Sequence, residues 1–84
     1  MTTPDILDDI FKELARAKKQ HPNWPDHPAG QAGIVCEEAG ELMKACLQKK
    51  YERKKLSDAD HRRNMRTEAV QVAVTAIRFL ENLQ

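Results

Sequence analysis

The sequence predicts an all-α protein with three main helices, a helical bundle completed by dimerisation, in a single domain over residues 1–84. Three stretches carry apolar residues at the three- and four-residue spacing of a helix, and prolines and N-cap residues mark their ends. A chain of this size buries only roughly 60% of its unfolded surface, so its own core is small. We therefore expect a homodimer or a tetramer.

The first helix is predicted over residues 4–19, with Thr3 as N-cap and Pro4 at the first helical position. Lys18 and Lys19 end it, as the helix dipole favours. Its apolar stripe consists of Ile6, Leu7, Ile10, Phe11 and Leu14. The segment that follows, HPNWPDHP, holds three prolines in eight residues and is predicted to be a stiff, extended connection.

The second helix is predicted over residues 28–52, with Gly33 and Gly40 as close-packing positions inside it. A buried stripe is expected at Ala32, Val35, Ala39, Leu42 and Cys46, with Cys36, Met43 and Leu47 beside it. The two cysteines stand about 15 Å apart along such a helix, too far for a disulfide, and are interpreted as buried small hydrophobes.

A linker over residues 53–56 precedes the third helix, which is predicted to begin after Ser57 as N-cap, with Asp60 completing a capping-box variant, and to run to about residue 83. Apolar side chains cover most of its circumference: Met65, Val72, Ala76 and Leu83 on one side, and Val70, Val74 and Ile77 on another. A helix apolar nearly all round is buried on several sides, so part of this surface is expected to pack against a second subunit.

Composition excludes several classes of protein. Hydrophobic residues make up 40% of the chain, charged residues 32%, and the net charge is +1. No apolar run approaches the roughly 20 residues of a membrane span and the acidic N-terminus lacks the regions of a signal peptide, so a cytoplasmic protein is expected. Without a CxxC pair, or a histidine at metal-site spacing from a cysteine, zinc has little support. Residues 49–66 carry eight Lys or Arg against three acids, which fits either a solvated segment or a rim that attracts polyanions.

Acidic side chains in two of the helices indicate a metal site. Glu38 and Glu41 share a face of the second helix, with Glu37 one turn before Glu41. The polar residues of the third helix form one stripe: Asn64, Glu68, Gln71, Thr75 and Arg78. If the two helices pack antiparallel these groups converge, and oxygen ligands suit Mg²⁺, with Mn²⁺ as the alternative. The acidic motif alone also fits a solvated face, but Glu68 lies among apolar neighbours, where an unpaired charge is costly, and this favours the metal site.

These motifs resemble the MazG-like, all-α nucleoside triphosphate pyrophosphohydrolases, whose pattern is EExxE followed after a gap by ExxD. Residues 37–41 read EEAGE, and residues 68–71 read EAVQ. The resemblance implies a dimeric bundle that hydrolyses a nucleoside triphosphate to the monophosphate and pyrophosphate with magnesium. It further implies that Glu38, Glu41 and Glu68 are metal ligands, that Gln71 occupies the fourth ligand position, and that Glu37 orients or deprotonates the attacking water.

Gln71 departs from the family pattern, and two roles for it stay open. Its amide oxygen can coordinate a cation but supplies no charge, which predicts a weaker metal site. Alternatively, its amide nitrogen donates a hydrogen bond to a substrate oxygen or to a neighbouring carboxylate. In the first case, the chain is a slow enzyme, an enzyme with a different metal count, or a nucleotide binder without catalysis.

Four further residues are candidates for substrate binding. Trp24 either stacks on a nucleobase or covers the end of the bundle. Lys44 and Lys49 are candidates for receiving phosphates, and Arg78 ends the polar stripe. The main alternative function is a non-catalytic helical oligomerisation or interaction module. A nucleic-acid-binding protein ranks third, because the third helix is basic only in its first turns.

Overall fold

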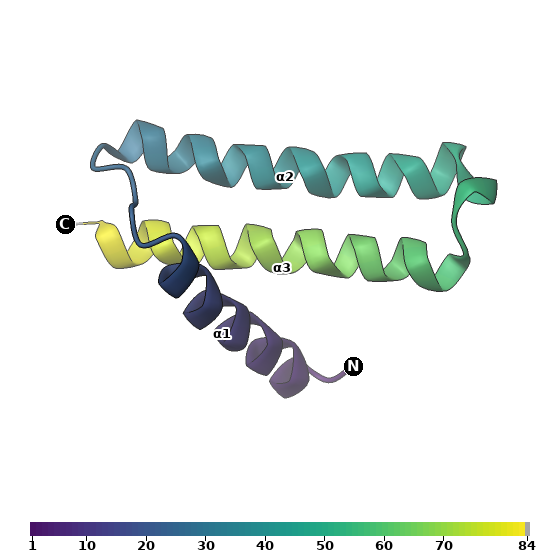
Figure 1. Cartoon of the computed structure of the whole chain (residues 1–84), viewed down its shortest axis with the longest axis horizontal. Coiled ribbons are helices and arrows are strands. Elements are labelled where there is room, and N and C mark those ends of the chain that lie inside the picture. Colours follow the sequence, from purple (N-terminus) through teal and green to yellow (C-terminus); the bar gives the residue numbers. More distant parts are fainter. Residues whose placement is uncertain (84) are drawn as a thin grey trace.

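The computed structural model describes residues 1–83 and contains three α-helices. Helix α1 spans Thr3–Gln20, α2 spans Pro28–Tyr51 and α3 spans Asp58–Asn82, with a single 3-10 turn, η1, at Arg53–Lys55. Figure 1 shows α2 and α3 running antiparallel as a long hairpin, while α1 crosses α3 obliquely near its C-terminal end. The predicted all-α fold with three main helices is confirmed.

The start of α1 lies one residue earlier than predicted. Thr2, and not Thr3, is the N-cap, because the Thr2 hydroxyl accepts a hydrogen bond from the Asp5 backbone N–H at 3.4 Å. The Asp5 carboxylate in turn accepts from the Thr2 backbone N–H at 3.2 Å, which completes a capping box. Asp5 stands three residues after Thr2, so its carboxylate can complete a capping box with Thr2 but not with Thr3.

The proline-rich connection at residues 21–27 is not helical, as predicted, and it is hydrogen-bonded to the start of α2. His27 is the N-cap of α2, with its Nδ1 atom accepting from the Ala29 N–H at 3.0 Å. Gln31 is only 4% exposed, and its side-chain amide donates to the Pro25 carbonyl at 2.9 Å. This part-buried hydrogen bond holds the connection against the first turn of α2.

The two glycines expected to allow close packing do not have that role within one chain. Gly33 and Gly40 lie inside α2 without interrupting it, as predicted, but a Cβ atom at either would meet nothing within 4 Å. Gly30 is instead the glycine at a closely packed position, because a Cβ atom there would lie 3.2 Å from the Cβ of Pro25.

The predicted linker at residues 53–56 contains the η1 turn, and α3 begins after the N-cap Ser57 as predicted. The Asp60 carboxylate does not complete the expected capping box, because it accepts instead from Arg63 at 3.0 Å. The hydroxyl of Ser57 accepts from the Asp60 N–H at 3.0 Å, which satisfies one of the backbone donors left free at a helix start. Helix α3 ends at Asn82, one residue before the predicted end.

The core of a single chain is smaller than the apolar pattern predicts. Its buried apolar residues are Ala17, Ala45 and Val74. In the predicted α2 stripe, Val35 and Leu42 are half-buried, whereas Ala32, Ala39 and Cys46 are exposed. Cys36 is also exposed, so the interpretation of both cysteines as buried hydrophobes is wrong for one chain.

The reason is that, within residues 1–83, no other element covers one side of α2. On this side Met43 is 59% exposed and Tyr51 is 71% exposed.

Within residues 1–83 no helix is both long enough and apolar enough to cross a membrane.

Candidate functional site

The polar stripe of α3 faces the other helices over most of its length. Thr75 and Arg78 are buried, with Arg78 only 6% exposed, whereas Glu68 and Gln71 are half-buried and Asn64 is exposed. The Thr75 hydroxyl is satisfied locally, because it donates to the Gln71 carbonyl at 2.9 Å. The Glu68 carboxylate, the Gln71 amide and the Arg78 guanidinium are therefore the groups of the stripe that are available to contact a ligand.

A cavity of about 430 Å³ opens where α1, the proline-rich connection, α2 and α3 meet. Its volume lies within the range of small-molecule sites. Arginines and glutamates share it with aromatic and amide side chains. Its lining comprises Arg16, Ala17, His21, Asn23, Trp24, Ile34, Glu37, Glu38, Gln71, Val74, Thr75 and Arg78.

The four glutamates of the sequence motif lie close enough to influence one another. Burial raises the pKa of the half-buried Glu38 carboxyl, and the negative charges of Glu68, Glu41 and Glu37 raise it further. None of the ion pairs formed within residues 1–83 involves Glu38. A carboxylate in this setting is stabilised by a cation.

The candidate metal ligands are of a type that suits a hard divalent cation, but their side chains are not arranged around a common point. Every candidate ligand offers oxygen, which Mg²⁺ and Mn²⁺ prefer. In the described part of the chain, no group of three or more His, Cys, Asp or Glu lies at metal-binding distances. Glu37 and Glu38 line the cavity, whereas Glu41 and Glu68 do not. Side-chain movement is therefore needed before Glu38, Glu41 and Glu68 can reach one ion.

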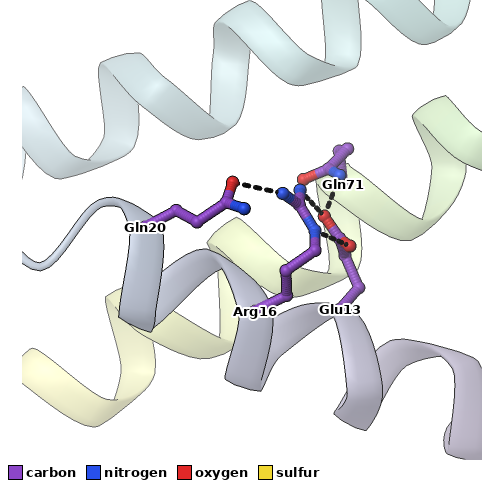
Figure 2. Close-up of polar contacts among 4 residues, drawn as sticks. All are labelled: Glu13, Arg16, Gln20 and Gln71. Carbon is purple, nitrogen blue, oxygen red and sulfur yellow. Dashed lines mark hydrogen bonds and ion pairs between the residues drawn. The ribbon is translucent and has the colours of Figure 1, made fainter.

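Gln71 makes a hydrogen bond that connects α3 to α1. Its Nε2 donates to Oε2 of Glu13 at 2.5 Å, as Figure 2 shows. Of the two roles that the sequence left open, the structure contains donation to a neighbouring carboxylate. The Glu13 carboxylate is also held by Arg16, whose Nε donates to Oε1 at 2.6 Å and whose Nη2 pairs with Oε2. The hydrogen bond from Arg16 and then that from Gln71 lower the pKa of Glu13, while burial opposes them.

Arg78 and Trp24 form the second notable contact of the cavity. The guanidinium carbon of Arg78 lies 4.4 Å from the centroid of the Trp24 ring, and Nη2 donates to the His21 carbonyl at 2.8 Å. No carboxylate pairs with Arg78 within residues 1–83. The Trp24 indole N–H is also buried, and no group in the described part of the chain accepts a hydrogen bond from it. Unpaired buried donors of this kind suit a ligand rich in acceptors.

The structure does not bring the two candidate lysines to this cavity. Lys44 lies in a shallow apolar hollow along α2 with Gly40 and Met43. Lys49 lies at the far end of the hairpin, beside Arg53. Of the four predicted substrate-binding residues, Trp24 and Arg78 line the cavity.

Sequence reasoning missed Glu13 and Arg16. They stand three residues apart on a helix, and such a pair ordinarily lies on a solvated face. No signal in the sequence distinguishes them from the exposed Asp8–Lys12 pair of the same helix.

Comparisons of the chain with protein-family models, with curated proteins and with solved structures gave no match.

Proposed function

We propose that the protein is a metal-dependent nucleoside triphosphate pyrophosphohydrolase, which converts a nucleoside triphosphate and water to the monophosphate and pyrophosphate. The observation that carries the proposal is one cavity that holds both Arg78 and Glu38. Within residues 1–83, the buried Arg78 guanidinium has no carboxylate partner and the Glu38 carboxylate has no cationic partner. A metal–polyphosphate complex offers both the anion and the cation that these groups lack. The resemblance of residues 37–41 to the EExxE motif supports the same class.

The glutamates would hold Mg²⁺ or Mn²⁺. Glu38, Glu41 and Glu68 are the proposed ligands, and Gln71 offers a neutral oxygen beside them. When bound, the ion would neutralise charge on the phosphates and lower the pKa of a coordinated water. The convergence of negative charge on Glu38 supports this assignment, because a cation removes the repulsion that raises its pKa.

Glu37 is the proposed general base. It is exposed and lines the cavity next in sequence to Glu38. Its carboxylate would accept a proton from the attacking water. The water oxygen would form a bond to the α-phosphorus as the bond from that phosphorus to the bridging oxygen breaks, and pyrophosphate would leave with the electron pair.

Arg78 and Trp24 are the proposed substrate-binding residues. Arg78 uses one N–H on the His21 carbonyl, and the remaining donors of its guanidinium are available to a ligand. The Trp24 indole N–H, buried without a partner, adds a donor in the same cavity. The two side chains would bind phosphate or nucleobase acceptors.

We further propose that a second copy of the chain completes the bundle, as a dimer or a dimer of dimers. Apolar side chains remain exposed on all three helices: Ile6, Leu7, Phe11, Met43, Leu47, Tyr51 and Leu80. A wholly apolar hollow between α2 and α3, lined by Val35 and Phe79 among others, extends this surface. Burial of such a surface against a second copy would stabilise both chains.

Pyrophosphate release from a panel of ribo- and deoxyribonucleoside triphosphates, with Mg²⁺ or Mn²⁺, tests the proposal. The native chain should release pyrophosphate and Glu38→Gln should not. Glu52→Gln is the control at the C-cap of the same helix, because within residues 1–83 Glu52 forms its one ion pair with Lys55, and that pair is exposed. Metal-independent release, or equal release by Glu38→Gln, would contradict the proposed metal site.

The exposed apolar faces also suit the alternative function, a non-catalytic interaction module. A chain that assembles normally, releases no pyrophosphate from any triphosphate and shows no Mg²⁺-dependent stabilisation would favour that alternative.

A further inference from the structure

Gln71 and Glu13 come from different helices and meet beside the candidate site. Gln71 lines the cavity together with Glu37 and Glu38, whereas Glu13 lies outside its lining. Their hydrogen bond, with Nε2 2.5 Å from Oε2, is part-buried and spans 58 positions of the sequence. Another side-chain contact between α1 and α3, from Lys18 to Glu81 at 2.8 Å, is exposed.

The Glu13 carboxylate determines which end of the Gln71 amide points toward α1. An ionised carboxylate only accepts hydrogen bonds, so the amide must present its nitrogen to Glu13. The planar amide then directs its oxygen away from Glu13. None of the hydrogen bonds within residues 1–83 uses that oxygen, so it remains an acceptor available to a cation or to a donor.

The same carboxylate also holds an arginine of the cavity. Arg16 donates to Glu13 through both Nε and Nη2, and its Nη1 donates to Gln20, as Figure 2 shows. Three of the five guanidinium N–H groups are used in this way, and the other two remain for a ligand. Glu13 therefore contacts two side chains that line the cavity without lining it itself.

An uncharged side chain at position 71 suits the two nearby carboxylates, Glu13 and Glu68. A carboxylate there would place a second negative charge beside Glu13, on a helix that already carries Glu68 one turn earlier. Like charges at such separations disfavour each other's ionised form. An amide provides both an oxygen for a cation and a donor for Glu13.

We propose that Glu13 is a positioning residue of the candidate site, which keeps the Gln71 amide oxygen directed away from the Glu13 carboxylate and holds Arg16 at the edge of the cavity. Helix α1 thereby becomes part of the site. The inference rests on the proposed metal-dependent function. It goes beyond that function by assigning to the first helix a role that the glutamate motif does not contain.

Calorimetric titration of Mg²⁺ into the native chain, Glu13→Ala and Glu13→Gln tests the inference. Alanine favours helix and removes the carboxylate from a half-buried position, so α1 should still form. We expect Glu13→Ala to weaken Mg²⁺ binding about tenfold or more, as loss of an outer partner of a metal ligand does. Glu13→Gln should retain most of the affinity, because its amide oxygen still accepts from Gln71.

Glu81→Ala is the matched control for the attachment of α1. It removes the Lys18 contact between the same two helices at a place outside the cavity lining. Native-like Mg²⁺ affinity in Glu81→Ala, together with the loss in Glu13→Ala, supports the positioning role. Equal losses in both variants, or none in Glu13→Ala, would overturn it.

The side-chain amide resonance of Gln71 provides a readout without metal or substrate. In the metal-free chain it should shift in Glu13→Ala and keep its native position in Glu81→Ala. An unshifted resonance in Glu13→Ala would contradict the contact itself. If the native chain bound no Mg²⁺, the proposed function would fall along with the inference, whereas native binding that is insensitive to Glu13 would overturn only the inference.

Discussion

Arg78 stacks on Trp24, with its guanidinium carbon 4.4 Å from the ring centroid, while the only hydrogen bond of the guanidinium within residues 1–83 goes to the His21 carbonyl. The guanidinium is thus buried between an aromatic ring and a backbone carbonyl, and its charge is not neutralised by a carboxylate there. Cation–π contact with Trp offsets part of the desolvation of the guanidinium, and a bound anion would offset more.

Arg78→Lys should weaken nucleotide binding about tenfold or more, because lysine keeps the charge but loses the planar donors and the stacking. Trp24 is the chain's single tryptophan, so its fluorescence reports directly on binding of a nucleoside monophosphate or of pyrophosphate. Arg62→Lys, at an exposed position of α3, is the control. If both variants bound like the native chain, Arg78 would have only a structural role.

Glu38→Gln should stabilise the metal-free protein by no more than about 1 kcal/mol and abolish stabilisation by Mg²⁺. The gain arises because burial and the nearby glutamates raise the pKa of Glu38 in the folded chain, so its ionised form opposes folding. The gain is therefore present at neutral pH, falls as the pH drops through the raised pKa, and vanishes below the pKa of an unfolded glutamate. Thermal unfolding of the two proteins across this pH range measures it. A gain independent of pH would contradict the electrostatic explanation.

Gln71→Asp should destabilise the chain by about 1–3 kcal/mol, because it removes the donor to Glu13 and adds a carboxylate to its surroundings. Denaturant unfolding of the metal-free protein tests this. Combining Gln71→Asp with Glu13→Gln should recover part of the loss, since the new amide at position 13 can donate to the new carboxylate. A Gln71→Asp chain that bound Mg²⁺ more tightly than the native chain would instead favour the interpretation of Gln71 as a weakened metal ligand.

Met43→Glu should shift the protein from dimer to monomer at micromolar concentration. Met43 is a large, exposed apolar residue of α2, and a charge there would be buried without a partner in an interface formed by this face. Sedimentation measures the assembly state, with Arg66→Glu at an exposed, polar position of α3 as control. A monomeric native chain would contradict the proposed completion of the bundle by a second copy.

Local signals in the sequence predicted the helices well, because each boundary depends on a few neighbouring residues. Ser57 was identified as an N-cap, and the prolines that end the first helix were interpreted correctly. The choice between Thr2 and Thr3 failed because both are good caps, and the position of Asp5 decides between them.

Burial and the outer part of the candidate site were predicted less well. The apolar periodicity of α2 indicates a face that can be buried, but it does not indicate which element covers that face. Cys36 and Cys46 are therefore predicted to be buried, whereas both are exposed. Glu37 and Glu38 could be found from their motif, whereas Glu13 and Arg16 depend on how α1 crosses α3. That crossing is set by long-range contacts, such as the bond from Arg78 to the His21 carbonyl.

The oblique placement of α1 also bears on the order of folding. Helices α2 and α3 follow each other in the chain and are joined by a short turn, so their hairpin can form early. Helix α1 must then dock through pairs that are far apart in the chain, among them Gln71 with Glu13. The cavity at the junction of all three helices would therefore be the last part of the molecule to form. Local opening of α1 would remove one wall of this cavity while leaving the hairpin of α2 and α3 intact.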